Sequence, residues 1–268
     1  MNRIEIKGNV MNPTFLKHSR PLLTTMIQVQ NPDDAIVAVR NALFDGADAF
    51  GFQICQFDPQ YRTEETYKTV FSFMEDKPIY ITNYRYGFSR DYTDEQRAEE
   101  LLVAIKAGAT LCDIMGDLYD PSPLELTKNR EAIEKQKKLI EHVHEMGGEA
   151  LMSSHINQFL PTEQVIEVAK EQEARGIDIV KIVTQANSEE ELLENLKTSV
   201  DLKKELNIPF LFLANGCHCK LQRIIGPMFG SVMYLCVQQY DKLASKNQPL
   251  LRSTREVLNH MDWKPNRS

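Results

Sequence analysis

The chain has 268 residues, of which 42% are hydrophobic and 26% charged, the composition of an ordinary soluble globular protein and not of a disordered one. Its formal net charge of −7 argues against a general nucleic-acid-binding surface, and no segment approaches the roughly 20 apolar residues of a membrane-spanning helix. The N-terminal segment lacks the apolar stretch of a secretory signal, and the five scattered cysteines fit a reduced, cytoplasmic setting.

Apolar segments rich in β-branched residues recur along the whole chain and predict eight strands. They cover residues 21–29, 47–55, 78–84, 109–115, 149–155, 177–183, 209–215 and 230–238. Helical patterns lie between them. In the first of these patterns Asn31 is the expected cap, Pro32 the first helical residue and Gly46 the end. Similar patterns follow, with Thr93 as a further expected cap, in residues 93–108, 162–176 and 188–206.

Strands that alternate with helices predict a parallel α/β fold, and eight such units in this length favour a (β/α)8 TIM barrel over an open sheet. No glycine-rich phosphate loop follows the first strand, which weakens a nucleotide-binding alternative. No linker interrupts the pattern, so residues 1–268 are predicted to form a single domain, with residues 1–20 as an N-terminal extension that closes the barrel bottom. In such barrels the chemistry takes place where the strands end.

A lysine, Lys181, lies in the middle of the sixth predicted strand, where an unpaired charge is costly. His155 ends the preceding strand, and neighbouring strands are about 4.8 Å apart, so the two side chains are expected to meet inside the barrel mouth. A buried lysine with a lowered pKa can form a Schiff base with a ketone, and a nearby histidine can then remove the acidified proton. The residues alone leave a structural, ion-paired lysine as the alternative.

The second half of the chain resembles the type I 3-dehydroquinate dehydratases. The resemblance is carried by residues 150–196, which include a Ser-x-His strand end and the Asp-Ile-x-Lys-Ile strand, and continues through residues 221–236 and 243–249. It implies that Lys181 forms an imine with the substrate's ketone and that His155 moves the protons. It also implies a homodimer, a small keto acid as substrate, and no metal or organic cofactor.

The same resemblance assigns substrate-binding residues. Arg223 matches an arginine that grips the substrate carboxylate, and Ser245 and Gln248 match a loop that closes over the site. The family has a Glu-x-Arg pair at the end of its second strand, where this chain has Gly51 and Gln53. Gln53 is nevertheless predicted to lie at the substrate.

Departures continue at the third strand. Arg85 is the expected counterpart of a family arginine, but no glutamate follows to support the histidine, and Asp91 is the nearest acid. Asp113 matches a family aspartate at the end of the fourth strand. These losses predict weak affinity for a polyhydroxylated ring, because each lost hydrogen bond costs about 1–3 kcal/mol.

Two further clusters have more than one interpretation. The cysteines and histidine of residues 217–219 lack the spacing typical of a zinc site and need a fourth ligand, so no metal is predicted. The aromatic residues of the third strand and its loop either line a pocket for a flatter, less hydroxylated ligand or pack in the core; they are Tyr80, Tyr84, Tyr86 and Phe88.

The sequence therefore predicts a Schiff-base lyase that dehydrates 3-dehydroquinate or a related cyclic β-hydroxyketone carboxylic acid. One alternative is a non-catalytic descendant that binds a carboxylated small molecule. Another is a Schiff-base aldolase or lyase that acts on a different substrate.

Overall fold

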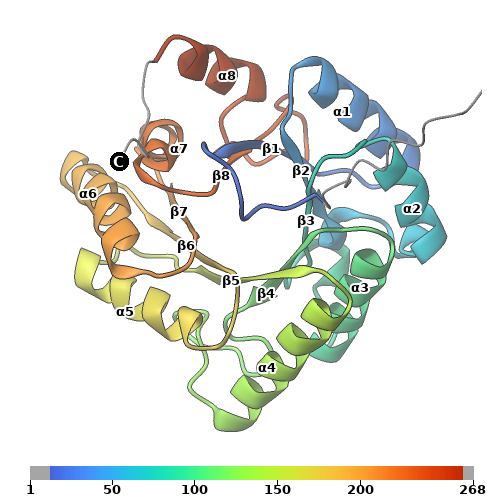
Figure 1. Cartoon of the computed structure of the whole chain (residues 1–268), viewed down its shortest axis with the longest axis horizontal. Coiled ribbons are helices and arrows are strands. Elements are labelled where there is room, and N and C mark those ends of the chain that lie inside the picture. The colour runs from blue at the N-terminus through green and yellow to red at the C-terminus, as the bar shows by residue number, and fades with distance from the viewer. Residues whose placement is uncertain (1–12, 262–268) are drawn as a thin grey trace, which may run out of the picture.

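The computed structural model describes residues 13–261, which form eight parallel strands surrounded by helices (Figure 1). The strands are β1 (Leu22–Ile27), β2 (Ala49–Gln53), β3 (Ile79–Thr82), β4 (Leu111–Met115), β5 (Glu149–His155), β6 (Ile179–Gln185), β7 (Phe210–Asn215) and β8 (Met233–Cys236). Each coincides with one of the predicted apolar segments. The predicted single-domain (β/α)8 TIM barrel is confirmed.

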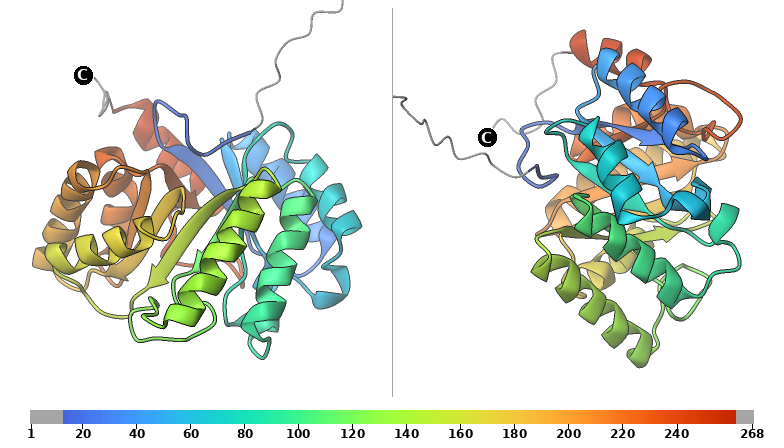
Figure 2. Two further views of the ribbon diagram at one scale, coloured as in Figure 1. Left: turned by 60° about the horizontal axis from the view of Figure 1, so that its bottom comes forward. Right: turned by 90° about the vertical axis from the view of Figure 1, so that its right-hand side faces the viewer.

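The helices lie on the outside of the barrel (Figure 2). They are α1 (Pro32–Phe44), α2 (Glu64–Ser72), α3 (Asp94–Lys106), α4 (Arg130–Glu145), α5 (Thr162–Glu173), α6 (Glu189–Glu205), α7 (Cys219–Ile225) and α8 (Leu251–Asn259). Both predicted caps are confirmed: Asn31 accepts a hydrogen bond from the backbone of Asp34, and Thr93 forms a capping box with Gln96. Within residues 13–261, no helix has the length and apolar character needed to cross a bilayer.

The strands pair in the order β7-β6-β5-β4-β3-β2-β1-β8, so the barrel is nearly closed. In the described residues β7 and β8 share no ladder, although the backbone of Val232 donates to Phe210 with a nitrogen–oxygen distance of 2.9 Å. The register of β5 and β6 places Ser153 opposite Lys181 and His155 opposite Val183. His155 therefore lies one inward-facing position nearer the barrel mouth than Lys181.

The strands are buried on both faces, because one face packs inside the barrel and the other against the helices. Inside the barrel, a cluster includes Met26, Ala49, Tyr80, Leu211 and Leu235. This packing explains why the strand sequences are almost continuously apolar.

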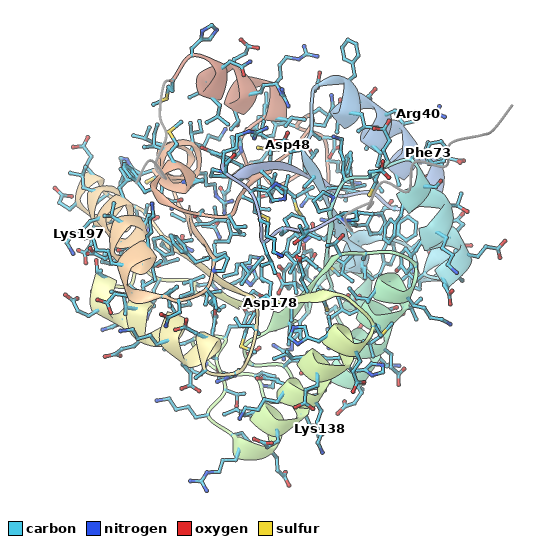
Figure 3. All side chains as sticks on the ribbon, viewed as in Figure 1. Arg40, Asp48, Phe73, Lys138, Asp178 and Lys197 are labelled. Carbon is cyan, nitrogen blue, oxygen red and sulfur yellow. The ribbon has the colours of Figure 1, made fainter. Side chains whose placement is uncertain are left out.

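Aspartates at the start of strands hold neighbouring strands together. The Asp48 carboxylate accepts a hydrogen bond from the backbone of Leu23 at 3.0 Å, and that of Asp178 accepts one from Ala150 at 2.7 Å. Figure 3 labels both aspartates over the barrel, whereas Lys138 and Lys197 extend from the outer helices. These contacts connect neighbouring strands at their N-terminal ends, opposite the end of the barrel where the strands finish.

Part of the predicted N-terminal extension is described. Phe15 is fully buried in the cluster inside the barrel, and Thr14 donates a hydrogen bond to Glu149, the first residue of β5. These contacts are at the start of the strands. The remainder of the extension, residues 1–12, lies outside the described residues.

Candidate active site

A pocket of about 390 Å³ opens at the end of the barrel where the strands finish. All seven residues that the sequence places at the site line it: Gln53, Arg85, His155, Lys181, Arg223, Ser245 and Gln248. Tyr80, Tyr84 and Tyr86 of the aromatic cluster line it too, whereas Phe88 is not among the lining residues and is partly exposed. The pocket brings together residues from seven strands and from the segments that follow strands.

Lys181 lies at the inner end of this pocket and points into the barrel. Its Nζ donates hydrogen bonds to the hydroxyl of Tyr84 at 2.5 Å, to that of Tyr80 at 2.8 Å and to Asp113 Oδ2 at 3.0 Å. Burial lowers the pKa of Lys181, although the negative charge of Asp113 opposes this shift. The amine therefore loses its proton more readily than an ordinary lysine does.

Asp113 is the buried anion of this cluster. Burial alone would raise the pKa of Asp113, but the charge of Lys181 and the hydroxyls of Ser153 and Tyr80 outweigh it and lower the pKa. Its Oδ1 accepts a hydrogen bond from Ser153 at 2.5 Å, and its Oδ2 accepts one from Tyr84 at 2.6 Å. The carboxylate therefore stays ionised.

The two tyrosines remain phenols, because burial, together with the charge of Asp113, raises the pKa of Tyr80 and Tyr84 well above the usual range. Tyr84 also contacts His155: the rings meet edge to face, with their centroids 4.7 Å apart. One side chain thus touches both the amine and the imidazole. This contact places Lys181 and His155 at the same side of one pocket.

The carboxylate beside His155 is Glu125, from the loop between β4 and α4. Its Oε2 lies 2.7 Å from Nδ1 of His155 and also accepts a hydrogen bond from the backbone nitrogen of that histidine. This geometry suits a hydrogen bond from Nδ1 of the ring to the carboxylate. Asp91, the nearest acid after the third strand in the sequence, is exposed, and the carboxylate beside the histidine is that of Glu125.

Glu125 is placed by the loop itself. Its backbone nitrogen donates to the carbonyl of Ser122 at 3.0 Å, and its carbonyl accepts from the hydroxyl of Ser154 at 2.9 Å. Its φ of 48° lies in the left-handed region, which turns the side chain toward β5. Glu125 lies in the segment that follows the fourth strand. The rule that sites form where barrel strands end therefore marks this segment as a place to look for site residues.

Arg223 on α7 is a buried cation at another side of the pocket. Its Nε donates to the carbonyl of Ala214 at 2.7 Å and its Nη2 to Asn215 Oδ1 at 2.9 Å. No carboxylate of residues 13–261 forms an ion pair with it, and burial lowers its pKa to about 10. A buried guanidinium without an anion favours binding of an anionic ligand.

The loop between β8 and α8 carries Ser245 and Gln248 over the pocket. The backbone nitrogen of Ser245 donates to Gln28 Oε1 at 3.1 Å, which ties the loop to the end of β1. The side-chain oxygen of Gln248 is buried and has no hydrogen-bond partner among residues 13–261. Gln248 therefore has an unused acceptor at the pocket.

Gln53 and Arg85 line the pocket but already have protein partners. Gln53 accepts from Gln28 at 2.6 Å and donates to the hydroxyl of Tyr86. Arg85 forms ion pairs with Asp94 at 2.7 Å and with Asp117 at 2.6 Å. Substrate contact by either residue stays a prediction.

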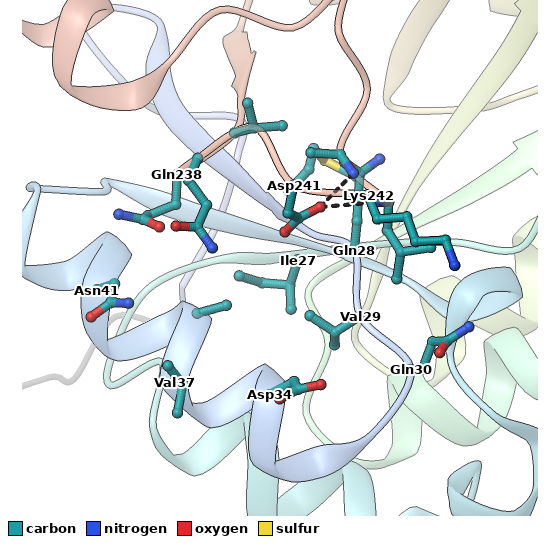
Figure 4. Close-up of a pocket in the computed structure, with 16 residues that line it drawn as sticks. Ile27, Gln28, Val29, Gln30, Asp34, Val37, Asn41, Gln238, Asp241 and Lys242 are labelled. Atoms are coloured by element: carbon teal, nitrogen blue, oxygen red, sulfur yellow. Dashed lines mark hydrogen bonds between the residues drawn. The ribbon is translucent and has the colours of Figure 1, made fainter.

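A second cavity of about 340 Å³ lies beside the first, between α1 and the loop that follows β8 (Figure 4). Met26 and Gln28 line both cavities, and Asp241 and Lys242 border only the second. Asp241 accepts hydrogen bonds from the backbone of Leu243 and of Ala244, both at 2.8 Å. This contact fixes the turn that separates the two cavities.

The cysteines of residues 217–219 lie apart from the pocket lining. Cys217 is exposed and donates to the carbonyl of Asn187 at 3.3 Å, whereas Cys219 is buried at the start of α7. Over the part of the chain that the structure describes, no group of three or more His, Cys, Asp or Glu side chains is arranged to hold a metal ion.

The chain is similar in sequence and in structure to the type I 3-dehydroquinate dehydratases. The family model for type I 3-dehydroquinase matches residues 24–264. A 3-dehydroquinate dehydratase of Alkaliphilus oremlandii is 33% identical over 110 residues, or 40% of this chain and 42% of that protein. One from a Geobacillus species is 24% identical over 204 residues, or 66% of this chain and 78% of that protein.

Solved structures share the fold. The 3-dehydroquinate dehydratase of Geobacillus kaustophilus superposes with a TM-score of 0.75 at 17% identity, over 91% of this chain and 92% of that one. A type I 3-dehydroquinate dehydratase from Clostridium difficile with covalently modified comenic acid gives a TM-score of 0.76 at 17% identity, over 91% and 93%. The match to the Alkaliphilus protein spans less than half of its length.

Proposed function

Because this chain belongs to the type I 3-dehydroquinase family, we propose that it is a Schiff-base-forming dehydratase, a carbon–oxygen lyase. Its substrate is 3-dehydroquinate or a related cyclic β-hydroxyketone carboxylic acid. The observation that carries the proposal is the contact of Tyr84 with both Lys181 and His155 at one pocket. The nucleophile and the proton-transfer group that imine chemistry requires are therefore neighbours.

In this mechanism the Lys181 amine adds to the ketone carbon, and loss of water gives a protonated imine. The imine acidifies the adjacent carbon, and Nε2 of His155 removes a proton from it. His155 returns that proton to the β-hydroxyl, which leaves as water while the carbon–carbon double bond forms. A second water then hydrolyses the imine and frees the amine.

The surrounding residues supply charge and orientation. Glu125 keeps Nδ1 of His155 protonated and stabilises the imidazolium that forms during the transfer. Arg223 provides the positive charge for the substrate carboxylate, with Ser245 and Gln248 covering it from the loop. All of these steps use side chains of the chain itself.

One observation favours the alternative of a non-catalytic carboxylate binder. The three hydrogens of a protonated Lys181 each have an acceptor: Tyr80, Tyr84 and Asp113. A structural ammonium group has the same pattern. Imine formation requires one of these contacts to open, and the lowered pKa of Lys181 favours such an opening.

Borohydride trapping separates the two functions. The protein is incubated with 3-dehydroquinate or a simpler cyclic keto acid, reduced, and analysed by intact mass and peptide mapping. We expect one adduct, on Lys181, and no adduct in Lys181→Met. Lys242→Met, which alters only the second cavity, is the matched control and keeps the adduct. No adduct with any ketone in the wild-type protein contradicts the proposed function.

A homodimer and a cytoplasmic location belong to the same proposal. Both rest on the family resemblance, and all five cysteines are free thiols, as in a reduced compartment. Light scattering coupled to size-exclusion chromatography measures the assembly; a monomer at micromolar concentration contradicts the dimer.

A further inference from the structure

The pocket has two chemically different sides. One side has unused capacity for hydrogen bonds and charge: Arg223 forms no ion pair with a carboxylate of residues 13–261, and the buried side-chain oxygen of Gln248 has no partner. This side suits the carboxylate of a ligand and the hydroxyl beside it.

On the side formed by β1 and β2 the amides are already bonded to protein groups. The Gln53 oxygen accepts a hydrogen bond from Gln28, and the Gln53 nitrogen donates one to the hydroxyl of Tyr86. The side-chain oxygen of Gln28 in turn accepts a hydrogen bond from the backbone nitrogen of Ser245. A continuous chain of hydrogen bonds thus connects the loop between β8 and α8 to Tyr86.

Next to this chain the wall is apolar. The thioether of Met26 occupies the space that a Cβ at residue 51 would need, because Gly51 has no side chain. The Met26 side chain therefore forms this part of the wall. Met26 and Leu235 both line the pocket and belong to the cluster inside the barrel. Sulfur is only a weak hydrogen-bond acceptor. The wall therefore offers hydrocarbon and sulfur to a ligand.

We infer that the substrate carries no hydroxyl groups on the carbons that face Met26. Its chemical class is a cyclic β-hydroxyketone carboxylate whose side remote from the carboxylate is hydrocarbon. This inference rests on the proposed Schiff-base function and narrows its substrate. A hydroxyl buried against this wall loses water without gaining a partner, which weakens transition-state binding by about tenfold or more.

The reaction is the same dehydration, in which the substrate loses one molecule of water. One proton leaves the carbon beside the imine, the β-hydroxyl leaves with that proton as water, and the product is the conjugated enone. No oxidant or cofactor enters. The missing hydroxyls are on ring carbons that lose neither the proton nor the leaving group.

Two ketones of equal ring size test the inference: 3-dehydroquinate, and 1-hydroxy-3-oxocyclohexane-1-carboxylate, which lacks the two remote hydroxyls. We expect kcat/KM, followed by the ultraviolet absorbance of the enone, to be at least tenfold higher for the dideoxy compound. Equal or faster turnover of 3-dehydroquinate overturns the inference while leaving the proposed function intact.

If neither compound is dehydrated, calorimetric dissociation constants decide the inference separately. Tighter binding of the dideoxy compound supports it, and tighter or equal binding of 3-dehydroquinate overturns it. Absence of a borohydride adduct with both compounds counts against the proposed function alone, so the two failures are distinguishable.

Variants of Met26 locate the preference at this wall. Met26→Gln places an amide there and should reduce the ratio of the two kcat/KM values by about tenfold or more, since hydroxyls gain a partner. Met26→Leu keeps the wall apolar at similar size and should retain the ratio. Thermal melting of both variants verifies that they fold. A ratio unchanged in folded Met26→Gln contradicts the assignment of the preference to this wall.

Discussion

Oε2 of Glu125 and Nδ1 of His155 lie 2.7 Å apart, so a loop after β4 fixes the orientation of the histidine at the end of β5. The two residues are 30 positions apart in the sequence. This contact restores a supporting carboxylate that the third strand of the chain does not provide.

Replacing Glu125 by Gln should lower kcat by about 10–100-fold, because the imidazolium loses its counter-charge and the ring its orientation. Trapping of the ketone on Lys181 should persist, since the amine does not depend on this carboxylate. Steady-state kinetics and borohydride labelling measure the two effects. Asp91→Asn, at an exposed position, is the control with unchanged rate; a full rate in Glu125→Gln would remove Glu125 from the mechanism.

The pH dependence of imine trapping follows from Lys181. Because burial lowers its pKa, the neutral amine forms below the ordinary lysine value of 10.5, and trapping should rise with pH and level off below that value. The charge of Asp113 raises the lysine pKa, so Asp113→Asn should move the midpoint to still lower pH. Trapping rates across a pH series give both midpoints. A midpoint in Asp113→Asn at or above that of wild type contradicts the assigned ion pair.

Arg223→Met removes the cation proposed to hold the carboxylate. KM for a keto acid should rise by about 10–100-fold, which corresponds to a loss of about 1.5–3 kcal/mol for a hydrogen bond to a charged group. Cyclohexanone, a neutral ketone, should be trapped equally well by both proteins because it has no carboxylate. Equal losses for the neutral ketone and the acid would mean that the variant disturbs the lysine instead.

Phe15 tests whether the N-terminal segment closes the barrel. Phe15→Ala should reduce the free energy of unfolding by about 3–5 kcal/mol, because a fully buried ring leaves a cavity. Phe44→Ala, at an exposed ring on α1, should change it by no more than about 0.5 kcal/mol. Urea denaturation compares the two. Similar values for both variants would show that the segment is dispensable.

The barrel is predictable from the sequence because each strand is a short apolar segment rich in β-branched residues, which is recognisable on its own. Lys181 stands out against the β-branched residues around it, and the strand order of a barrel then places it beside His155. These conclusions need only local pattern and the pairing of consecutive strands.

What the sequence could not give are contacts that cross the barrel or pass through loops. Tyr84 contacts Lys181, which is 97 positions away in the sequence. Whether two such residues lie at the same level along the barrel axis depends on the tilt of the strands, which no local sequence pattern encodes. Gln28 and Gln53 look like unremarkable polar strand ends, yet their side chains are hydrogen-bonded to each other. Glu125 was missed because the path of the loop decides which of its acids faces His155.

The backbone of Glu125 has a left-handed conformation, which lowers the stability of the fold unless the side chain compensates. A side chain in this conformation costs about 1 kcal/mol, a penalty that glycine does not incur. The carboxylate offsets this cost, because it contacts both the backbone nitrogen and the ring of His155, and glycine at residue 125 would lose both contacts. Engineering of a more robust form should hold this residue constant and seek its gains in the outer helices.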